Sequence, residues 1–455
     1  MQMGEVRRLN ETTVGIIGMG RTGQAVARFL RRRGVQCIGF DEHVKQASPD
    51  LIELRRGRLE AADFSDCDAL IVSPGIDWRH PALERARRMG KEVRGDLDLF
   101  CEHFHGQLLA VTGTNGKTTT VTLIATLLEV LPGGIEAAGN IGRPMLDVLD
   151  AGTPPARVVL ELSSFQLERS SNIHPRWAAL LNVQPDHADM HADMSSYSAA
   201  KCRLFMHQGK GDRSLLPQQE EWDALQAELE ARGVDVGRFG HDHGQSGHLC
   251  AGLQYDENGC SVFWTQKGER QCVPADRLRI RGMHQHMNLA VAAQAAADYG
   301  VSTSVISLAL ETFRGLPHRM QWIGHFGGRD WYDDSKATNP DAASAALQSF
   351  DRVLWICGGL RKGLALDALI GPASRHVAHA YVIGRDMEAY ADMLKHAGVP
   401  FTKAGRLEQA VQLAAAHAEP LPVLLSPAAA SQDQFEDYAE RGKAFAAAAR
   451  KVEAA

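Results

Sequence analysis

The chain has 455 residues, a length that predicts roughly three domains of ordinary size. Hydrophobic residues make up 44% and charged residues 23%, as in soluble globular proteins, and the net charge of −6 argues against general nucleic-acid binding, which needs a basic surface. The sequence has no apolar run of membrane-spanning length, and its eight cysteines have no zinc-binding or C-x-x-C spacing. We therefore expect reduced thiols, a cytoplasmic location, and no membrane or nucleic-acid partner.

Residues 14–43 have the pattern of a dinucleotide-binding unit. An apolar run enters a turn containing Gly18, Gly20 and Gly23, a helical pattern follows, and a second apolar run ends at Asp41. Such glycines bring backbone N–H groups close to a phosphate, and the acidic residue is suited to a ribose or base hydroxyl. Packing alone can also require these glycines. The pattern leaves open whether the turn binds a nicotinamide cofactor or another nucleotide.

Short apolar runs alternate with helical patterns along most of the chain, which predicts an α/β fold of three domains. A second alternating series begins at residue 107, and a third follows Pro317. The expected domains are residues 1–96, 97–316 and 317–455. The basic run from Arg28 to Gly34 is interpreted as the solvated end of a helix.

The segment "AVTGTNGKTTT" is the strongest local signal in the sequence. An apolar run leads into a glycine-rich turn, and a helical pattern begins at once. Backbone amides of such a turn surround a polyphosphate, Lys117 supplies a cation and Thr118 a hydroxyl for Mg²⁺. The predicted ATP contacts are Gly113, Thr114, Asn115, Gly116, Lys117, Thr118 and Thr119.

Oxygen ligands for Mg²⁺ are expected at strand ends near this turn. Glu161 closes the apolar run "RVVLE", and "NVQPDHADMH" supplies Asp186, His187, Asp189 and His191. A polar loop or a zinc site are the alternatives for the second group, although no cysteine pair completes a zinc site. Lys201 follows on a predicted helix, where lysine is ordinarily exposed to solvent.

Two polar turns flank the last predicted domain boundary. "GLPHRMQ" contains Arg319, and "DDSKATNP" contains Lys336. Both cations are expected to reach a phosphate bound in the second domain when the domains close. The alternative is that their prolines only punctuate a linker and begin a helix.

These motifs together resemble those of the Mur ligases over the whole chain. The shared segments are "GTNGKTTT", "GNIG" (139–142), "ELSSFQLE" (161–168), "LNVQPDH" (181–187), "YSAAK" (197–201), "GMHQHMN" (282–288), "GLPHR" (315–319), "DDSKATNP" (333–340) and "LLSPAAASQDQF" (424–435). The combination of "SSFQLE", "DSKATNP" and "SPAAAS…DQF" is most similar to the ligases that join D-glutamate to UDP-N-acetylmuramoyl-L-alanine. The resemblance implies a Rossmann-like first domain, a central P-loop ATPase-like domain and a Rossmann-like third domain.

The resemblance also implies a role for each matching residue. The first domain would bind uridine diphosphate rather than NAD, through Arg21, Thr22, Asp41 and Gly75, and the muramoyl part would contact Asn140, Ser163 and Gln166. Thr118, Glu161, His187 and a carbamoylated Lys201 would hold Mg²⁺, and Asn288, Asp334 and Arg319 would face the adenine nucleotide. The incoming amino acid would contact Thr338, Lys362, Ser431 and Tyr438. The implied catalytic residues are Lys117, His187, Lys201, Arg319 and Lys336.

The implied reaction is ATP-dependent amide formation through an acyl phosphate, carried out by a cytoplasmic monomer in peptidoglycan precursor synthesis. Three alternatives stay open. A sister ligase would add another amino acid, such as L-glutamate or a diamino acid. A nicotinamide oxidoreductase would use residues 14–43 and leave residues 113–120 without a role. A nucleotide sensor would have a degenerate site, which the presence of Lys117, Glu161, His187 and Lys201 disfavours.

Overall fold

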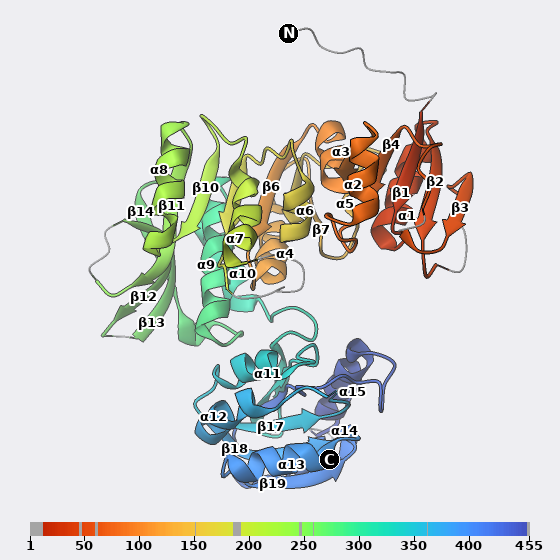
Figure 1. The fold of residues 1–455 in the computed structure, drawn as a ribbon. Coiled ribbons are helices and arrows are strands. Elements are labelled where there is room, and N and C mark those ends of the chain that lie inside the picture. Colours follow the sequence, from red (N-terminus) through yellow and green to blue (C-terminus); the bar gives the residue numbers. More distant parts are fainter. Residues whose placement is uncertain are drawn as a thin grey trace. The chain divides into compact units, whose positions relative to one another are not determined.

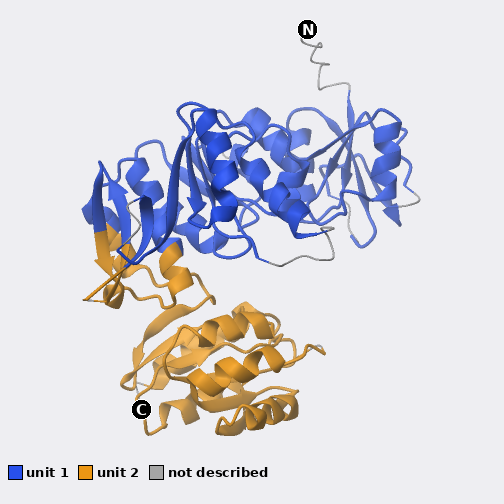
Figure 2. Cartoon of the chain, turned by 60° about the vertical axis from the view of Figure 1, so that its left-hand side comes forward, with its two compact units in different colours: residues 1–254, 263–271, 288–306 blue, residues 255–262, 272–287, 307–455 orange. Residues whose placement is uncertain are grey.

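The computed structural model describes residues 12–44, 48–59, 62–150, 152–184, 193–244, 248–257, 259–361 and 363–452. The chain forms two compact units (Figure 2). The first contains residues 1–254, 263–271 and 288–306, and the second contains residues 255–262, 272–287 and 307–455. Helices and strands alternate along most of the chain (Figure 1), and the predicted α/β class is confirmed.

The first sheet is parallel and has the strand order β3-β2-β1-β4-β5. Its strands are β1 (Thr13–Ile17), β2 (Gln36–Asp41), β3 (Glu53–Arg56), β4 (Ala69–Val72) and β5 (Glu92–Gly95). The helices of this region are α1 (Arg21–Arg31), α2 (Pro81–Arg88) and α3 (Asp96–His103). The strand order reverses between β1 and β4, and open α/β sheets bind ligands beyond the carboxyl ends of the strands at such a reversal.

The second sheet has nine strands in the order β14-β13-β12-β11-β10-β9-β6-β8-β7. They are β6 (Gln107–Thr112), β7 (Ile135–Gly139), β8 (Arg157–Glu161), β9 (Trp177–Leu180), β10 (Arg213–Pro217), β11 (Asp235–Asp242), β12 (Leu249–Asp256), β13 (Gly259–Gln266) and β14 (Glu269–Pro274). The helices are α4 (Lys117–Leu128), α5 (Met145–Leu149), α6 (Ser164–Arg169), α7 (Met194–Cys202), α8 (Asp223–Ala231), α9 (Met283–Asp298) and α10 (Thr303–Thr312). Strand β6 lies between β8 and β9, so the loop after β6 emerges where the strand order again reverses.

The third sheet has the order β15-β16-β20-β17-β18-β19, and only the β15–β16 pair is antiparallel. Its strands are β15 (Gln321–Phe326), β16 (Arg329–Asp333), β17 (Val353–Gly358), β18 (Val377–Ile383), β19 (Phe401–Gly405) and β20 (Val423–Leu425). The helices are α11 (Pro340–Leu347), α12 (Asp367–His376), α13 (Met387–His396), α14 (Leu407–Ala415) and α15 (Tyr438–Lys451). Alternate residues of β17 enter two separate hydrophobic clusters, as expected for a strand buried on both faces.

The first two sheets share a core. One hydrophobic cluster includes Val14 of β1, Phe29 of α1, Phe100 of α3 and Leu180 of β9. This continuity explains why both sheets belong largely to one compact unit. The predicted boundaries at residues 96 and 316 stay predictions.

The basic run from Arg28 to Gly34 lies at the end of α1, and Arg31, Arg32 and Gly34 are exposed there as expected, but some of its arginines also form ion pairs. Arg28 lies 2.7 Å from Asp147, at α5, and Arg32 lies 3.1 Å from Asp150. The hydrogen bond with Asp147 raises the pKa of Arg28. These ion pairs join the first sheet's helix to the central region.

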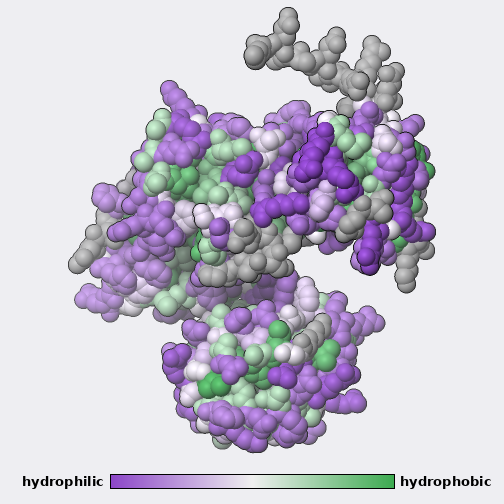
Figure 3. Space-filling view, viewed as in Figure 1, coloured by the Kyte–Doolittle hydropathy of each residue, from purple (hydrophilic) through white to green (hydrophobic). Residues whose placement is uncertain are grey.

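Hydrophilic side chains cover most of the face drawn in Figure 3, with apolar residues interspersed. The large apolar side chains that are exposed come from scattered segments: Ile52, Met89, Val130, Met194, Met283, Leu308 and Leu364. Along the described residues, none of the helices combines the length and the apolar character needed to cross a membrane.

Candidate active site

The predicted phosphate loop joins β6 to α4, as the sequence indicated. Gly113 and Gly116 both have positive φ, at 154° and 85°. A Cβ on Gly116 would lie 2.2 Å from Oδ1 of Asn288, and one on Gly113 would lie 3.0 Å from Cβ of Leu181. The loop therefore requires glycine at these positions, and Asn288 of α9 lies beside Gly116. Its contact with the adenine nucleotide stays a prediction.

Asn182, which follows β9, holds the loop and was not identified from the sequence. Its Oδ1 accepts hydrogen bonds from the backbone N–H groups of Thr114 at 3.1 Å and Asn115 at 2.9 Å. Its Nδ2 donates to the carbonyl of Asn115 at 3.1 Å. The adjacent Gln184 accepts from Asn115 Nδ2 at 3.0 Å. Both residues belong to the motif "LNVQPDH". Their side-chain amides, directly after a predicted strand, were the sequence feature that could have indicated this contact with the loop.

Lys117 and Lys201 meet at this loop. The Nζ of Lys117 donates to the carbonyls of Gly113 at 2.8 Å and Thr114 at 2.7 Å. The Nζ of Lys201 donates to the same Gly113 carbonyl at 2.9 Å and lies 4.4 Å from the ring centroid of Tyr197. Lys201 is only 1% exposed, so the expectation of a solvated lysine was wrong. Its spacing of four residues from the buried Tyr197 places both on one face of α7.

Glu161 has the properties of a Mg²⁺ ligand. It ends β8 in a buried position, and its Oε1 accepts a hydrogen bond from Asn140 Nδ2 at 3.1 Å. Its Oε2 is buried and has no hydrogen-bond partner in the described structure. An unpaired buried carboxylate oxygen is costly, and a hard cation satisfies it well. Glu161 therefore fits the predicted metal.

His187 and its neighbours Asp186, Asp189 and His191 lie outside the described residues. Within the described part of the chain, no group of three or more His, Cys, Asp or Glu side chains has a metal-binding arrangement. Thr118, the second residue of α4, is half-buried. The predicted metal set stays a prediction.

A cavity of about 760 Å³ lies at the carboxyl edge of the first sheet. Its lining includes Asp41, Gly75 and Ile76, together with the basic residues Arg55 and Arg56. The cavity thus brings together two of the predicted uridine contacts and adds cations that the sequence did not single out.

Asp41 also stabilises the glycine turn after β1 and the segment that follows β2. Its carboxylate accepts hydrogen bonds from the backbone N–H groups of Met19 at 2.6 Å, His43 at 2.8 Å and Val44 at 2.9 Å. Burial alone would raise the pKa of Asp41, but the three backbone donors hold it below its ordinary value. Asp41 therefore remains ionised near neutral pH.

Arg21, Ser163 and Gln166, which are predicted substrate contacts of the first unit, also make hydrogen bonds within the protein. Arg21, at the start of α1, donates to the carbonyl of Gly142 in "GNIG", and Thr22 follows it on the helix. Ser163 and Gln166 form a capping box on α6, with Gln166 N–H donating to Ser163 Oγ at 3.3 Å. Their predicted contacts with the muramoyl part stay predictions.

In the second unit, Arg319 lies in a strained turn. His318 and Met320 on either side have φ of 62° and 47°, which is unfavourable without glycine. The Nδ1 of His318 lies 2.7 Å from Oδ2 of the buried Asp333 and anchors the turn. Lys336 N–H donates to the carbonyl of His318 at 3.0 Å, so the motifs "GLPHR" and "DDSKATNP" are adjacent.

Asp334 is buried, and its oxygens have protein partners. Oδ1 accepts from Met320 N–H at 3.1 Å, and Oδ2 accepts from Ser426 Oγ at 2.8 Å. Burial raises the pKa of Asp334 to about 7, although both hydrogen bonds oppose this shift.

Among the predicted amino-acid contacts, Ser431 follows β20, which pairs with β17 where the strand order of the third sheet reverses. Ser431 is fully buried, and its Oγ has no hydrogen-bond partner among the described residues. Tyr438 begins α15, and its ring centroid lies 5.3 Å from Lys336 Nζ. Thr338 N–H donates to the carbonyl of Lys336 at 2.8 Å. Lys362 lies outside the described residues.

Three domain profiles match the chain in succession. The MurD-like N-terminal domain matches residues 12–95, the Mur ligase middle domain residues 111–296, and the Mur ligase glutamate ligase domain residues 318–429. The chain belongs to the Mur ligase family. The resemblance of its motifs is confirmed, as is the three-domain α/β class of this Mur ligase.

Curated relatives cover nearly the whole chain. A UDP-N-acetylmuramoylalanine–D-glutamate ligase of Caulobacter sp. (strain K31) is 38% identical over 97% of this Mur ligase and 97% of the relative. The enzyme of the same name from Legionella pneumophila (strain Paris) is 34% identical over 97% of this chain and 100% of its own.

Solved structures support the fold. The Thermotoga maritima UDP-N-acetylmuramate-alanine ligase is 18% identical, with 96% of this chain and 98% of that chain covered and a TM-score of 0.55. A UDP-N-acetylmuramoyl-L-alanyl-D-glutamate–2,6-diaminopimelate ligase structure gives 17% identity, 97% and 92% coverage, and a TM-score of 0.59.

Proposed function

We propose that this Mur ligase joins D-glutamate to UDP-N-acetylmuramoyl-L-alanine at the expense of ATP, as a cytoplasmic monomer in peptidoglycan precursor synthesis. The observation that carries the proposal is the pair of nucleotide cradles in one compact unit: the phosphate loop after β6 and the cavity beyond the first sheet. The relatives that cover nearly the whole chain carry the name of this activity. A nicotinamide oxidoreductase would leave the phosphate loop without a role.

The reaction has two steps. A carboxylate oxygen of the L-alanyl group attacks the γ-phosphorus of ATP, so that an acyl phosphate forms and the bond to ADP breaks. The amino nitrogen of glutamate then attacks the acyl carbon, loses a proton, and displaces inorganic phosphate as the amide bond forms. We propose that most of the rate acceleration comes from positioning and from neutralisation of phosphate charge.

Lys117 and the loop amides are the phosphate-binding groups of this proposal. In the structure the Nζ of Lys117 is bound to loop carbonyls, a position from which rotation about its side-chain bonds would carry it to a phosphate. Asn182 keeps the amides of Thr114 and Asn115 in place, so little reorganisation is needed when the nucleotide binds.

Thr118, Glu161, His187 and a carbamoylated Lys201 would hold Mg²⁺. Bound there, the ion would supply positive charge toward the phosphoryl oxygens. The unpaired Oε2 of Glu161 supports its part in this set. Carbamoylation would convert the buried Lys201 from a cation into an anion, which suits a buried group next to a metal.

The amino-acid site is proposed for the end of β17 and the segment after β20. The strand order of the third sheet reverses there, and the unpaired Oγ of Ser431 supports a polar ligand. Thr338, Lys362 and Tyr438 are the further proposed contacts, and Arg319, Lys336 and Asp334 are proposed for the adenine nucleotide.

The proposal is tested by measuring phosphate release from ATP with UDP-N-acetylmuramoyl-L-alanine and a panel of amino acids. D-glutamate should support turnover, and L-glutamate and diamino acids should not. Lys117→Ala should reduce turnover by at least about 100-fold. Turnover with another amino acid instead would identify a sister ligase, and turnover unchanged in Lys117→Ala would overturn the ATP assignment.

A further inference from the structure

Arg169, the last residue of α6, reaches into the loop that follows β4. Its side chain donates to the carbonyl oxygens of Val72 at 3.5 Å and Pro74 at 3.1 Å, and also to those of Ser73 and Ile76. Arg169 is only 5% exposed. One guanidinium therefore satisfies four carbonyls of a single turn, which fixes the path of residues 72–76.

The same turn forms a wall of the cavity beyond the first sheet. Gly75 and Ile76 line that cavity. Ser73 ties the turn to the glycine turn after β1, because its N–H donates to the carbonyl of Ile17 at 2.9 Å and its Oγ donates to that of Gly18 at 2.7 Å. A displacement of residues 72–76 would therefore change the shape of the cavity.

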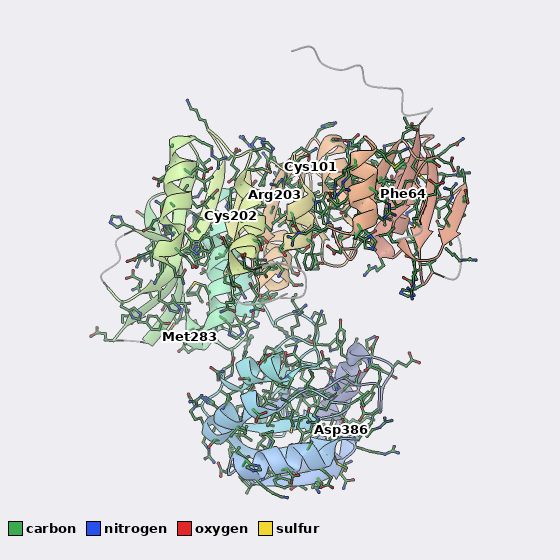
Figure 4. The ribbon with its side chains drawn as sticks, in the orientation of Figure 1. Phe64, Cys101, Cys202, Arg203, Met283 and Asp386 are labelled. Carbon is green, nitrogen blue, oxygen red and sulfur yellow. The ribbon has the colours of Figure 1, made fainter. Side chains whose placement is uncertain are left out.

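The backbone on either side of Arg169 is held by hydrogen bonds from Arg203. Arg203, labelled in Figure 4, donates from Nε to the carbonyl of Leu167 at 3.0 Å and also to that of Ser170. The guanidinium carbon of Arg169 lies 5.3 Å from the ring centroid of Trp78, within the range of a cation–π contact. A Cβ on Gly95 would lie 3.2 Å from Cβ of Arg169, so little free space surrounds the side chain.

Arg169 is buried, and among the described residues it has no ion pair, so the cost of desolvating its charge must be offset by hydrogen bonds. Desolvation lowers its pKa to about 10, and the charges of Asp96, Glu168 and Asp77 partly oppose the shift. Its Nε has no hydrogen-bond partner among the described residues. The charge is balanced mainly by carbonyl dipoles, and only a planar, multiply donating group can serve four of them at once.

Helix α6 connects two parts of the proposed substrate site. Its capping box contains Ser163 and Gln166, the proposed muramoyl contacts, and its last residue holds the turn that lines the proposed uridine pocket. We propose that Arg169 is a positioning residue that sets the spacing between the uridine pocket and the sugar contacts of α6. The inference rests on the proposed function for the identity of the ligand.

This role predicts a particular pattern of binding losses. A ligand that spans both subsites depends on their spacing, whereas UDP alone occupies one of them. Loss of Arg169 should therefore weaken the binding of the intact nucleotide sugar more than that of UDP. It should leave ATP binding unchanged, because Asn182 and the loop's own carbonyls, not Arg169, hold the phosphate loop.

The test compares Arg169→Met and Arg169→Lys with the wild type by calorimetry and steady-state kinetics. In Arg169→Met, we expect the dissociation constant and KM of UDP-N-acetylmuramoyl-L-alanine to rise at least about tenfold, UDP affinity to fall about threefold or less, and the KM of ATP to change less than about twofold. Lysine should not restore binding, because it cannot replace the forked donor. Equal losses for UDP and the intact sugar, or none, would overturn the inference.

Arg79→Ala is the matched control. Arg79 belongs to the same segment as Trp78 and pairs with Glu168 of α6 at 2.9 Å, but its side chain is 50% exposed. An exposed pair contributes little, so this variant should retain wild-type binding. A tenfold loss in Arg79→Ala as well would show that any contact between the segments suffices, and would overturn the special role of Arg169.

Hydrogen exchange provides a readout independent of catalysis. Amides of residues 73–80 should exchange faster in Arg169→Met and Arg169→Lys, whereas those of β17 should keep their wild-type rates. If the wild type released no phosphate with any amino acid, the proposed function would fail while this measurement and UDP binding still tested Arg169. Unchanged exchange in both variants would overturn the inference even with an active wild type.

Discussion

Lys117 and Lys201 donate to the same acceptor, the carbonyl oxygen of Gly113, at 2.8 and 2.9 Å. Two ammonium groups that share one carbonyl repel each other, and the repulsion is strong where Lys201 is buried. Conversion of Lys201 to a carbamate would replace the repulsion with an attraction. We therefore expect the chemical state of Lys201 to influence the position of Lys117.

Lys201→Ala should lower phosphate release by at least about 100-fold, because it removes the proposed metal-binding anion. A small added carboxylate, such as formate or acetate, should restore part of the lost activity by occupying the vacated space. Phosphate release measured across a carboxylate titration checks this expectation. Lys210→Ala, at an exposed position after α7, is the control and should retain full activity. Full activity in Lys201→Ala without added carboxylate would contradict the carbamate.

Gly116→Ala should disable the phosphate loop. The added Cβ would lie 2.2 Å from Asn288 Oδ1 at a φ of 85°, so both the loop and Asn288 must move. We expect a stability loss of about 1–3 kcal/mol and at least about a tenfold loss of ATP affinity, with UDP affinity retained. Thermal denaturation and calorimetry measure the two effects. Gly371→Ala serves as the control, because α12 has room for a methyl group there. An unchanged ATP affinity in Gly116→Ala would contradict this prediction, because it would mean that the loop and Asn288 accommodate the methyl group without loss of binding.

The phosphate loop and the first glycine turn were predictable because each depends on local rules. Glycine at a positive φ, an apolar strand before it and a helix after it are encoded within a few residues, and the observed β6–loop–α4 unit follows that order. The α/β class was predictable for the same reason, since apolar runs alternate with helical patterns along most of the chain, but the successive strands β11 to β14 do not follow that alternation.

Arg169 and Asn182 could not be assigned in this way. Each acts on backbone groups that are distant in sequence, such as Pro74 for Arg169, and such contacts depend on how strands are ordered in a sheet. The burial of Lys201 was misjudged because a lysine on an isolated helix pattern carries no sign of what covers that face. Long-range packing decided all three cases.

Asp334→Asn should flatten the pH dependence of stability in the second unit. Burial raises the pKa of Asp334 to about 7, above its ordinary value of 3.8, so the folded protein keeps a proton that the unfolded chain has lost. The resulting stabilisation is complete below about pH 4 and is lost as the pH rises to about 7, with a slope of up to about 1.4 kcal/mol per pH unit. Thermal midpoints of wild type and Asp334→Asn at pH 5, 6, 7 and 8 measure it.

The difference between the two midpoints is the informative quantity. The wild type should lose stability relative to Asp334→Asn between pH 5 and 7, and the difference should level off above that. Asp351→Asn removes an exposed carboxyl from the same unit and should give a nearly constant difference. A constant difference for Asp334→Asn too would mean that its carboxyl ionises normally.

Ser431 and Ser335 are both fully buried serines of the second unit, but alanine should affect them in opposite directions. Ser335 Oγ donates to the carbonyl of Tyr438 at 2.8 Å and accepts from Arg441 Nε at 2.9 Å, so Ser335→Ala leaves buried groups unpaired and should cost about 1–3 kcal/mol. Ser431 Oγ has no partner in the described structure, so Ser431→Ala should leave the free energy of unfolding unchanged or raise it by up to about 1 kcal/mol.

If the Ser431 hydroxyl binds the amino acid, the same variant should raise the KM of glutamate about tenfold while leaving the KM of ATP unchanged. Denaturation and initial-rate kinetics on both variants measure these effects. A destabilised Ser431→Ala, or one with an unaltered KM for glutamate, would show that Ser431 does not bind the amino acid.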